Sequence, residues 1–217
     1  MRCTCCFMAM AMAFATASAP LAVAAPSPIA AAVQHASFER QAPSNDARTV
    51  ADWVVSSGDS QGLPFVIVEK TDAMVYVFDA NGRLRGAAPA LLGLALGDSS
   101  VPGIGERKLD TILPQERTTP AGRFVAALDR NLHGGEILWV DYDNAISMHP
   151  VITSNAQERR AQRLASPSPL DNRISYGCIN VPPGFFQRVV HAAFAHSNGI
   201  VYVLPEVRPL REVFAIH

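Results

Sequence analysis

The sequence predicts a mainly β fold, and three observations support this prediction. Apolar residues between positions 65 and 205 fall in short continuous runs or alternate with a period of two, with Val, Ile, Tyr and Phe prominent. Turn-forming residues separate these runs. Only two stretches among them have helical spacing. The chain has 217 residues, 49% of them hydrophobic and 17% charged, which is enough for one globular domain plus flanking sequence.

The first 25 residues predict a secretory signal peptide. They combine Arg2, an apolar run rich in Ala and Met, and small residues that allow cleavage near Ala25 or Pro26. We therefore expect an exported protein of the periplasm or cell envelope, without stable membrane insertion after cleavage. The alternative is an uncleaved membrane anchor, which is less favoured because the apolar stretch is short and interrupted by Thr, Ser and Pro20.

Residues 26–45 predict a flexible leader, because they are rich in Ala, Pro, Ser and Gln and lack sustained periodicity. Residues 46–62 predict a short helix that flanks the domain. Asp46 is its expected N-cap, and the helix should end at Ser56 because two glycines follow. Its apolar side, which we expect to pack on the domain edge, consists of Val50, Trp53 and Val54. The domain itself would occupy residues 63–217.

The strands are expected in order along the domain. The first two, 65–70 and 74–79, are joined by a connection of hairpin length, and the turn signal Asn81-Gly82 leads to an extended segment through 87–96. Further strands are predicted at 122–128, 136–143, 145–150 and 200–205.

Two helices interrupt the strands. The first begins at Asn155, has Glu158 in the capping-box position, and continues until Pro167 and Pro169 stop it. It is charged and should be exposed. The second spans 183–196 and carries apolar residues at helical spacing, so it should pack on the sheet.

The charge and the cysteine count narrow the class of function. A net charge of −1 provides no basic field, so we expect no nucleic-acid partner. Cys3, Cys5 and Cys6 lie in the predicted signal peptide, which leaves Cys178 alone in the mature chain. An exported protein normally pairs its thiols, so Cys178 is either a buried passenger or a thiol kept free for use.

The segment Ser175-Tyr176-Gly177-Cys178-Ile179-Asn180 favours the second interpretation. A glycine directly before a cysteine lets the backbone approach a substrate closely and leaves the sulfur unshielded. A nucleophilic thiol needs a base that accepts its proton, and His149, at the end of a predicted strand, is the upstream candidate.

These residues resemble the signature of the L,D-transpeptidase (YkuD-like) catalytic domain, in which a His precedes Ser/Thr-x-Gly-Cys-hydrophobic-Asn. Thr119-Pro120-Ala121-Gly122-Arg123-Phe124 is similar to a second motif of that family. The resemblance covers roughly residues 63–205. It implies a β-sandwich or β-barrel with the cysteine in a cleft. The two helices predicted from spacing would then be one packed helix in the C-terminal half and one inserted charged helix.

The resemblance also implies roles. Cys178 would attack a stem-peptide carbonyl of peptidoglycan, and His149, oriented by the Pro150 carbonyl, would carry the proton. Backbone N–H groups around Tyr176, Gly177 and Cys178 would form the oxyanion hole, while Ser175 and Asn180 would brace the loop. No acidic third member and no cofactor are implied.

Two departures from the family pattern concern specificity. Tyr176 stands where His or Arg is common, which should alter substrate contacts. In addition, 25 residues separate His149 from Ser175, a longer interval than the motif usually has, so 153–172 resembles an inserted lid or rim. Four arginines lie near or within it, and each is either a substrate contact or part of a solvated face, with the solvated face favoured for the first three: Arg159, Arg160, Arg163 and Arg173.

Other candidate residues fit a structural interpretation better. His133 lies in a turn-like segment and is only the spare candidate for a base, while His191 and His196 are five residues apart, a poor spacing for metal ligands. We therefore predict no metal. Trp53 and Trp139 are expected to fill the core or a helix contact rather than to form a sugar-binding platform.

The resemblance therefore implies a peptidoglycan L,D-transpeptidase that acts on stem peptides, with functions in cell-wall biogenesis and cell shape. Two alternatives stay open: an L,D-carboxypeptidase or related amide hydrolase with the same Cys–His site, and a non-catalytic wall-binding module marked by Tyr176 and the insertion. Neither the acyl acceptor nor the oligomeric state is predicted.

Overall fold

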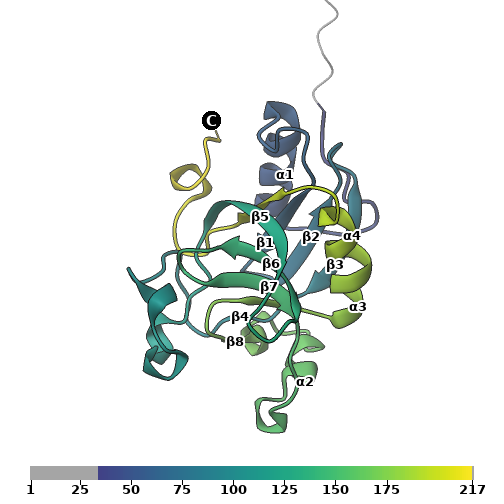
Figure 1. Ribbon diagram of the computed structural model, residues 1–217. Coiled ribbons are helices and arrows are strands. Elements are labelled where there is room, and N and C mark those ends of the chain that lie inside the picture. The colour runs from purple at the N-terminus through teal and green to yellow at the C-terminus, as the bar shows by residue number, and fades with distance from the viewer. Residues whose placement is uncertain (1–33, 217) are drawn as a thin grey trace, which may run out of the picture. The chain divides into compact units, whose positions relative to one another are not determined.

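The mainly β prediction is confirmed by a computed structural model, which describes residues 34–216 (Figure 1). The expected signal peptide and the first part of the leader lie outside these residues. The strands are β1 Phe65–Glu69, β2 Met74–Phe78, β3 Leu84–Pro89, β4 Leu92–Gly93, β5 Gly122–Arg130, β6 Glu136–Asp141, β7 Ile146–Pro150, β8 Arg173–Ser175, β9 Ile179–Val181 and β10 Gly199–Val203.

Eight of these strands form one mixed sheet in the order β3-β2-β1-β10-β5-β6-β7-β9, and β4 pairs with β8 in a second, two-stranded sheet. The pairs β1–β10 and β7–β9 are parallel, and the others in the large sheet are antiparallel. Leu91, just after β3, exchanges two backbone hydrogen bonds with Asn180 of β9, at 2.8 and 2.9 Å. This bridge connects the edge strand β9 to the residue that follows the other edge strand, β3, and so nearly closes the sheet into a barrel.

Alternation along the strands gives the sheet two apolar faces, each with its own core. On β1 the side chains of Val66 and Val68 belong to one core, and those of Phe65 and Ile67 to the other. This is why β1 is buried at every position and appears as a continuous apolar run in the sequence.

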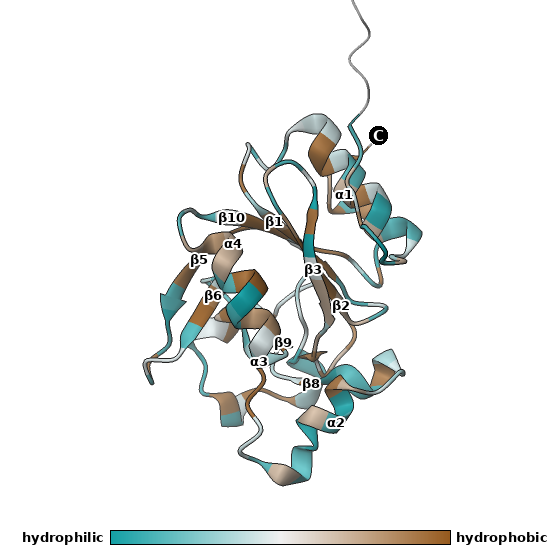
Figure 2. Ribbon diagram, turned by 90° about the vertical axis from the view of Figure 1, so that its right-hand side faces the viewer, coloured by the Kyte–Doolittle hydropathy of each residue, from teal (hydrophilic) through white to brown (hydrophobic). Residues whose placement is uncertain are grey.

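The predicted helix 183–196 covers the first core. It forms as α3 Pro183–Phe185, a π-helical turn Phe186–Val190 and α4 His191–Phe194. Its apolar side chains pack with those of β1, β2, β5, β6 and β7. The helix α1 Asn45–Ser57 covers the second core through Val50 and Val54. Figure 2 shows α1 and the α3–α4 segment on opposite sides of β1 and β10.

The start of the folded region differs from the prediction in two ways. Ser44, rather than Asp46, caps α1, because its side chain accepts a hydrogen bond from the Ala47 N–H at 3.1 Å. The helix ends at Ser57, and Gly58 caps it with a φ of 70°, the left-handed conformation that glycine allows. Part of the predicted flexible leader is also packed, since Ala36 and Phe38 are buried in the second core. The apolar side chain of Phe38 explains why this segment is held.

The inserted charged helix is shorter than predicted. Asn155 does cap a turn, because its side chain accepts a hydrogen bond from the Gln157 N–H at 3.1 Å, but that turn is the 3-10 helix Ala156–Glu158. Arg159, with a φ of 51°, breaks the helical path, and α2 then runs only over Arg160–Leu164.

Every helix in residues 34–216 is too short or too polar to span a bilayer.

The extended segment predicted at 87–96 is also divided, because β3 ends at Pro89 and β4 is two residues long. Between β4 and β5 the chain forms a long loop with three 3-10 turns: Ile104–Glu106, Leu109–Thr111 and Pro114–Glu116. This loop matters for the candidate site, since it supplies one wall of the pocket described below.

Candidate active site

Four polar side chains share one face of the parallel pair β7–β9. The register places His149 beside Asn180, and Met148 beside Ile179. Ser147 and Cys178 stand two residues before the first pair, so alternation turns all four to the same face. The intervening residues Ile146, Met148, Ile179 and Val181 point into the first core. The sheet thereby anchors a polar cluster on a rigid apolar base.

The imidazole of His149 is fixed through its Nδ1 atom. This atom lies 2.8 Å from the Pro150 carbonyl oxygen, the contact expected from the sequence. A carbonyl oxygen only accepts hydrogen bonds, so Nδ1 carries the proton and Nε2 of the neutral ring keeps its lone pair. The ring is therefore held in the tautomer that a general base requires.

The thiol of Cys178 is partly exposed and contacts strand β7. Its sulfur donates to the Ala145 carbonyl oxygen at 3.6 Å and lies 3.7 Å from the Ser147 hydroxyl oxygen. In this resting geometry the thiol proton points to a backbone carbonyl. Catalytic contacts commonly tighten only when substrate is bound.

The electrostatics of the pair favour ionisation of the thiol. Burial by itself raises the pKa of Cys178, but the interaction with His149 and the hydrogen bonds from Ser147 outweigh it, and the pKa is lowered. For His149 burial acts in the opposite direction, and the interaction with Cys178 again outweighs it and raises the pKa. Both shifts stabilise a thiolate–imidazolium pair.

Cys178 opens into a pocket of about 250 Å³. Strand β7 and the motif loop supply Ile146 and Tyr176, and the long loop after β4 supplies the opposite wall, which includes Ile104, Ile112 and Thr118. The Tyr176 ring is covered by the Arg117 guanidinium, whose central carbon lies 3.9 Å from the ring centroid. A ligand in this pocket would thus meet the sulfur and a wall that is largely apolar.

Gly177 is required by the backbone geometry of the loop before Cys178. Its φ is 134°, and a Cβ atom would lie 2.7 Å from both the Thr118 carbonyl oxygen and the Ile146 side chain. Ser175 braces the same loop, because its hydroxyl donates to the Cys178 carbonyl oxygen at 2.6 Å and accepts from the Gly177 N–H at 3.0 Å. This second bond occupies the Gly177 N–H, one of the three groups that the resemblance assigns to the oxyanion hole.

Thr119 connects the second motif, residues 119–124, to the site. Its hydroxyl donates to the Gly177 carbonyl oxygen at 2.8 Å and accepts from the Gly93 N–H at 2.9 Å. The side chain is fully buried. It thereby fastens the loop of Cys178 to β4 and to the start of β5.

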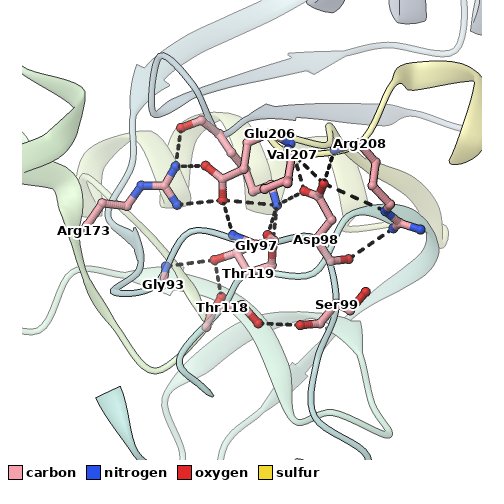
Figure 3. A network of polar contacts seen from close by, with 12 residues as sticks. Gly93, Gly97, Asp98, Ser99, Thr118, Thr119, Arg173, Glu206, Val207 and Arg208 are labelled. Carbon is pink, nitrogen blue, oxygen red and sulfur yellow. Dashed lines mark hydrogen bonds and ion pairs between the residues drawn. The ribbon is translucent and has the colours of Figure 1, made fainter. Parts of the chain in front are cut away.

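Behind Thr119 lies a buried ion network, shown in Figure 3. Lys70 is fully buried, and its Nζ lies 2.8 Å from an Asp98 carboxylate oxygen, 3.4 Å from a Glu206 carboxylate oxygen and 2.9 Å from the Thr119 carbonyl oxygen. Arg173 is also buried, with its guanidinium bound to Glu206 and, at 2.8 Å, to the Lys70 carbonyl oxygen. Two buried cations are thus balanced by two buried carboxylates.

The location of Arg173 decides between its two interpretations. Its guanidinium is engaged by Glu206 and the Lys70 carbonyl, and only 8% of its side chain is exposed. The residue therefore supports the strand that leads into the motif. The three arginines of the insertion differ from one another: Arg160 reaches Asn180, whereas Arg159 bonds to Gln162 and Arg163 to backbone carbonyls of its own segment.

His133 lies in the exposed β5–β6 turn, where the Asn131 side chain accepts hydrogen bonds from the N–H groups of His133 and Gly135. Its place fits a turn residue rather than a second base. Trp53 packs edge-on against Tyr202 of the second core, with ring centroids 6.0 Å apart. Trp139 lies on β6 beside Ser147 and packs against the exposed ring of Tyr142, with ring centroids 5.0 Å apart.

Sequence reasoning did not single out Ser147, Lys70 or Arg117 as parts of the site. A signal for Ser147 was present, because it alternates with His149 in a strand whose other side chains are apolar. Lys70 follows the apolar run of β1, and the neighbouring sequence does not indicate which groups would bind its ammonium. Its burial depends on carboxylates that are remote in sequence.

Comparisons with known proteins find structural likeness only. No family model matches the chain, and no curated protein matches it. The helical cell shape determining protein Pgp2 from Campylobacter jejuni is 18% identical, with a TM-score of 0.42 and coverage of 67% of this chain and 49% of that chain. An L,D-transpeptidase from Xylanimonas cellulosilytica is 13% identical, with a TM-score of 0.42 and coverage of 65% and 60%. One from Stackebrandtia nassauensis is 16% identical, with a TM-score of 0.39 and coverage of 67% and 57%.

The chain therefore spans about half to three fifths of the length of these solved structures. Identities and TM-scores this low do not establish an activity or a substrate for this chain.

Proposed function

We propose that this protein is an exported L,D-transpeptidase that acts on peptidoglycan stem peptides through a Cys178 thioester. The observation that carries the proposal is the thiol itself. It lines an open pocket, its pKa is lowered, and a histidine in the base tautomer shares its face of the sheet. The motif that surrounds it, from Ser175 to Asn180, supports the choice of family.

In the proposed reaction the Cys178 sulfur attacks the carbonyl carbon between the third and fourth residues of a stem peptide. The thiol proton passes to His149 Nε2, and a new S–C bond forms. The C–N bond then breaks as His149 returns the proton to the departing D-alanine amine, which leaves a thioester on Cys178.

The acyl group is then transferred. An amine of a neighbouring stem attacks the thioester carbon, a new amide bond forms, and the S–C bond breaks. His149 takes the proton of the attacking amine and returns it to the thiolate, so the enzyme is restored. Attack by water instead of an amine would give the carboxypeptidase outcome.

The N–H groups of Tyr176 and Cys178 are the better candidates for stabilising the oxyanion, since that of Gly177 is held by Ser175. Removal of one such donor in comparable enzymes costs about 3 kcal/mol. Tyr176, stacked under Arg117, would form the pocket wall against which the substrate lies.

Two measurements test the proposal. A carbapenem should add its mass covalently to the wild-type protein at Cys178 and leave Cys178→Ala unmodified. Purified wild-type protein incubated with muropeptides should yield cross-linked dimers that Cys178→Ala does not make. If the products are shortened stems without dimers, the protein is a carboxypeptidase and not a transpeptidase. If the thiol does not react with the carbapenem, a wall-binding module is favoured.

A further inference from the structure

We infer that Arg160 is a positioning residue for the Cys178–His149 pair and acts on it through Asn180. The inference deepens the proposed function and rests on it, because it concerns the same pair of groups. It also assigns a structural role in the site to the segment between β7 and β8, which contains Arg160.

Asn180 stands between the arginine and the pair. Its side-chain oxygen accepts a hydrogen bond from the Arg160 guanidinium at 2.7 Å. Its side-chain nitrogen lies 3.3 Å from His149 Nε2 and donates to the Cys178 carbonyl oxygen, also at 3.3 Å. One amide group therefore touches the insertion, the imidazole and the backbone of the nucleophile.

The directions of these hydrogen bonds depend on one another. A guanidinium can only donate, so the oxygen of the Asn180 amide must face Arg160 and its NH₂ group must face His149. His149 Nε2 must then accept, which requires the proton to be on Nδ1. That is the tautomer the Pro150 carbonyl also selects. Without Arg160 the amide is free to flip and to present its oxygen to the ring.

Arg160 is itself held in place. Its Nε donates to the Glu158 carboxylate, and only 14% of its side chain is exposed. The backbone of Asn180 is equally fixed, because it exchanges two hydrogen bonds with Leu91. Both partners of the contact are thus anchored, which is the condition for one side chain to orient another.

The neighbouring arginine provides a matched control. Arg163 lies on the same short helix and donates to the carbonyl oxygens of Glu158 and Asp171, at 3.0 and 2.9 Å. These hydrogen bonds stabilise the insertion, and among the described residues none of them reaches Asn180. A change at this position tests whether loosening the insertion is sufficient to alter the site.

The experiment measures how fast iodoacetamide alkylates Cys178 at neutral pH, followed by peptide mass spectrometry on the full chain. Arg160→Gln should speed alkylation by up to about tenfold, because an amide oxygen turned to Nε2 and the loss of a nearby cation both raise the pKa of His149 and so stabilise the thiolate. Arg160→Lys, which keeps a cationic donor, should stay within about threefold of wild type. Arg163→Gln should react like wild type.

A double-mutant cycle tests the route through Asn180. If Arg160 acts only on the amide, Arg160→Gln combined with Asn180→Ala should react no faster than Asn180→Ala alone. Additive gains, or alkylation of Arg160→Gln at or below the wild-type rate, would overturn the inference. Melting temperatures are measured for each variant. If Arg160→Gln is unfolded, Glu158→Gln takes its place as the variant that loosens the guanidinium, with an acceleration of about threefold expected. Wild-type reactivity of that variant would then overturn the inference.

The readout separates this inference from the proposed function. Alkylation requires a reactive thiol but no peptidoglycan. A thiol that responds to Arg160 as described, in a protein that makes no cross-links, would contradict only the transpeptidase assignment. A thiol indifferent to Arg160, in a protein that does make cross-links, would contradict only the positioning role.

Discussion

At the scale of single residues, Ser147 is the neighbour of the thiol that sequence reasoning passed over. Its hydroxyl oxygen lies 3.7 Å from the Cys178 sulfur, and only 6% of the residue is exposed. Burial raises the pKa of Cys178, His149 lowers it most, and hydrogen bonds from Ser147 lower it further. Ser147 is therefore expected to increase the thiolate fraction without taking part in proton transfer.

Replacing Ser147 by Ala should raise the pKa of Cys178, because one donor to the thiolate is lost while His149 remains. The pH at which alkylation reaches half its maximal rate should move upward, and the rate at neutral pH should fall by about threefold. The measurement is the rate of iodoacetamide alkylation across a pH series. Ser100→Ala, in the same pocket, is the control, and an unchanged profile for Ser147→Ala would contradict the assignment.

At the scale of elements, the loop of Cys178 depends on Thr119, which begins the segment before β5. The Thr119 hydroxyl bonds to the Gly177 carbonyl and to the Gly93 N–H. These two bonds connect the motif loop to β4 and to the long loop that walls the pocket. The geometry at the sulfur is thus set partly by a residue on a different element.

Thr119→Val keeps the shape of the side chain but removes both hydrogen bonds. It should lower the free energy of unfolding by about 2 kcal/mol, since two buried backbone groups lose their partner. Alkylation of Cys178 should slow as well, because the loop is less fixed. Urea unfolding and alkylation rates check the two effects. Thr111→Val, at an exposed 3-10 turn, should change neither beyond about 0.5 kcal/mol or its kinetic equivalent.

Most strands were predictable because strand formation follows local alternation. The runs of β1, β2, β5, β6, β7 and β10 lie where the apolar pattern placed them. The inserted helix was only partly predictable. Asn155 caps a turn as expected, but Arg159 adopts a positive φ and ends it, so that Arg160 is directed to Asn180. A tertiary contact accompanies this departure from local propensity.

At the scale of the whole described domain, the ion network around Lys70 ties remote segments together. Asp98 accepts hydrogen bonds from Lys70 and from the backbone N–H groups of Glu206, Val207 and Arg208. Glu206 binds Arg173, next to the motif. Burial alone raises the pKa of Asp98, but these contacts outweigh burial and lower the pKa from 3.8 to about 2.

A lowered carboxyl pKa contributes stability above the unfolded value and loses it as the pH falls through the folded value. The wild-type protein should therefore lose about 2 kcal/mol from this group between pH 3.8 and about pH 2. Asp98→Asn should be less stable by about 3 kcal/mol at neutral pH, because Lys70 stays buried without this partner. Its stability should also depend less on pH in that acidic window.

Urea unfolding over a pH series measures both effects, with the exposed Asp110→Asn as the control. An Asp98→Asn variant that loses stability in acid as steeply as the wild type would show that the network is not held by this carboxylate. Equal stability of variant and wild type at neutral pH would have the same meaning.

The sequence by itself determined most of the strands and the packed helix, since each of these depends on neighbouring residues. Alternation already placed Ser147 on the face of His149, and Cys178 on the face of Asn180.

Only the tertiary structure decided which of these faces meet. His149 and Asn180 are 31 positions apart, and Thr119 and Gly177 are 58 apart. A strand pattern repeats every two residues and carries no information on which strand lies alongside or in which register. The Cys178–His149 pair, the Lys70 network and the contact of Arg160 with Asn180 exist because long-range packing satisfies buried polar groups that no local pattern could pair.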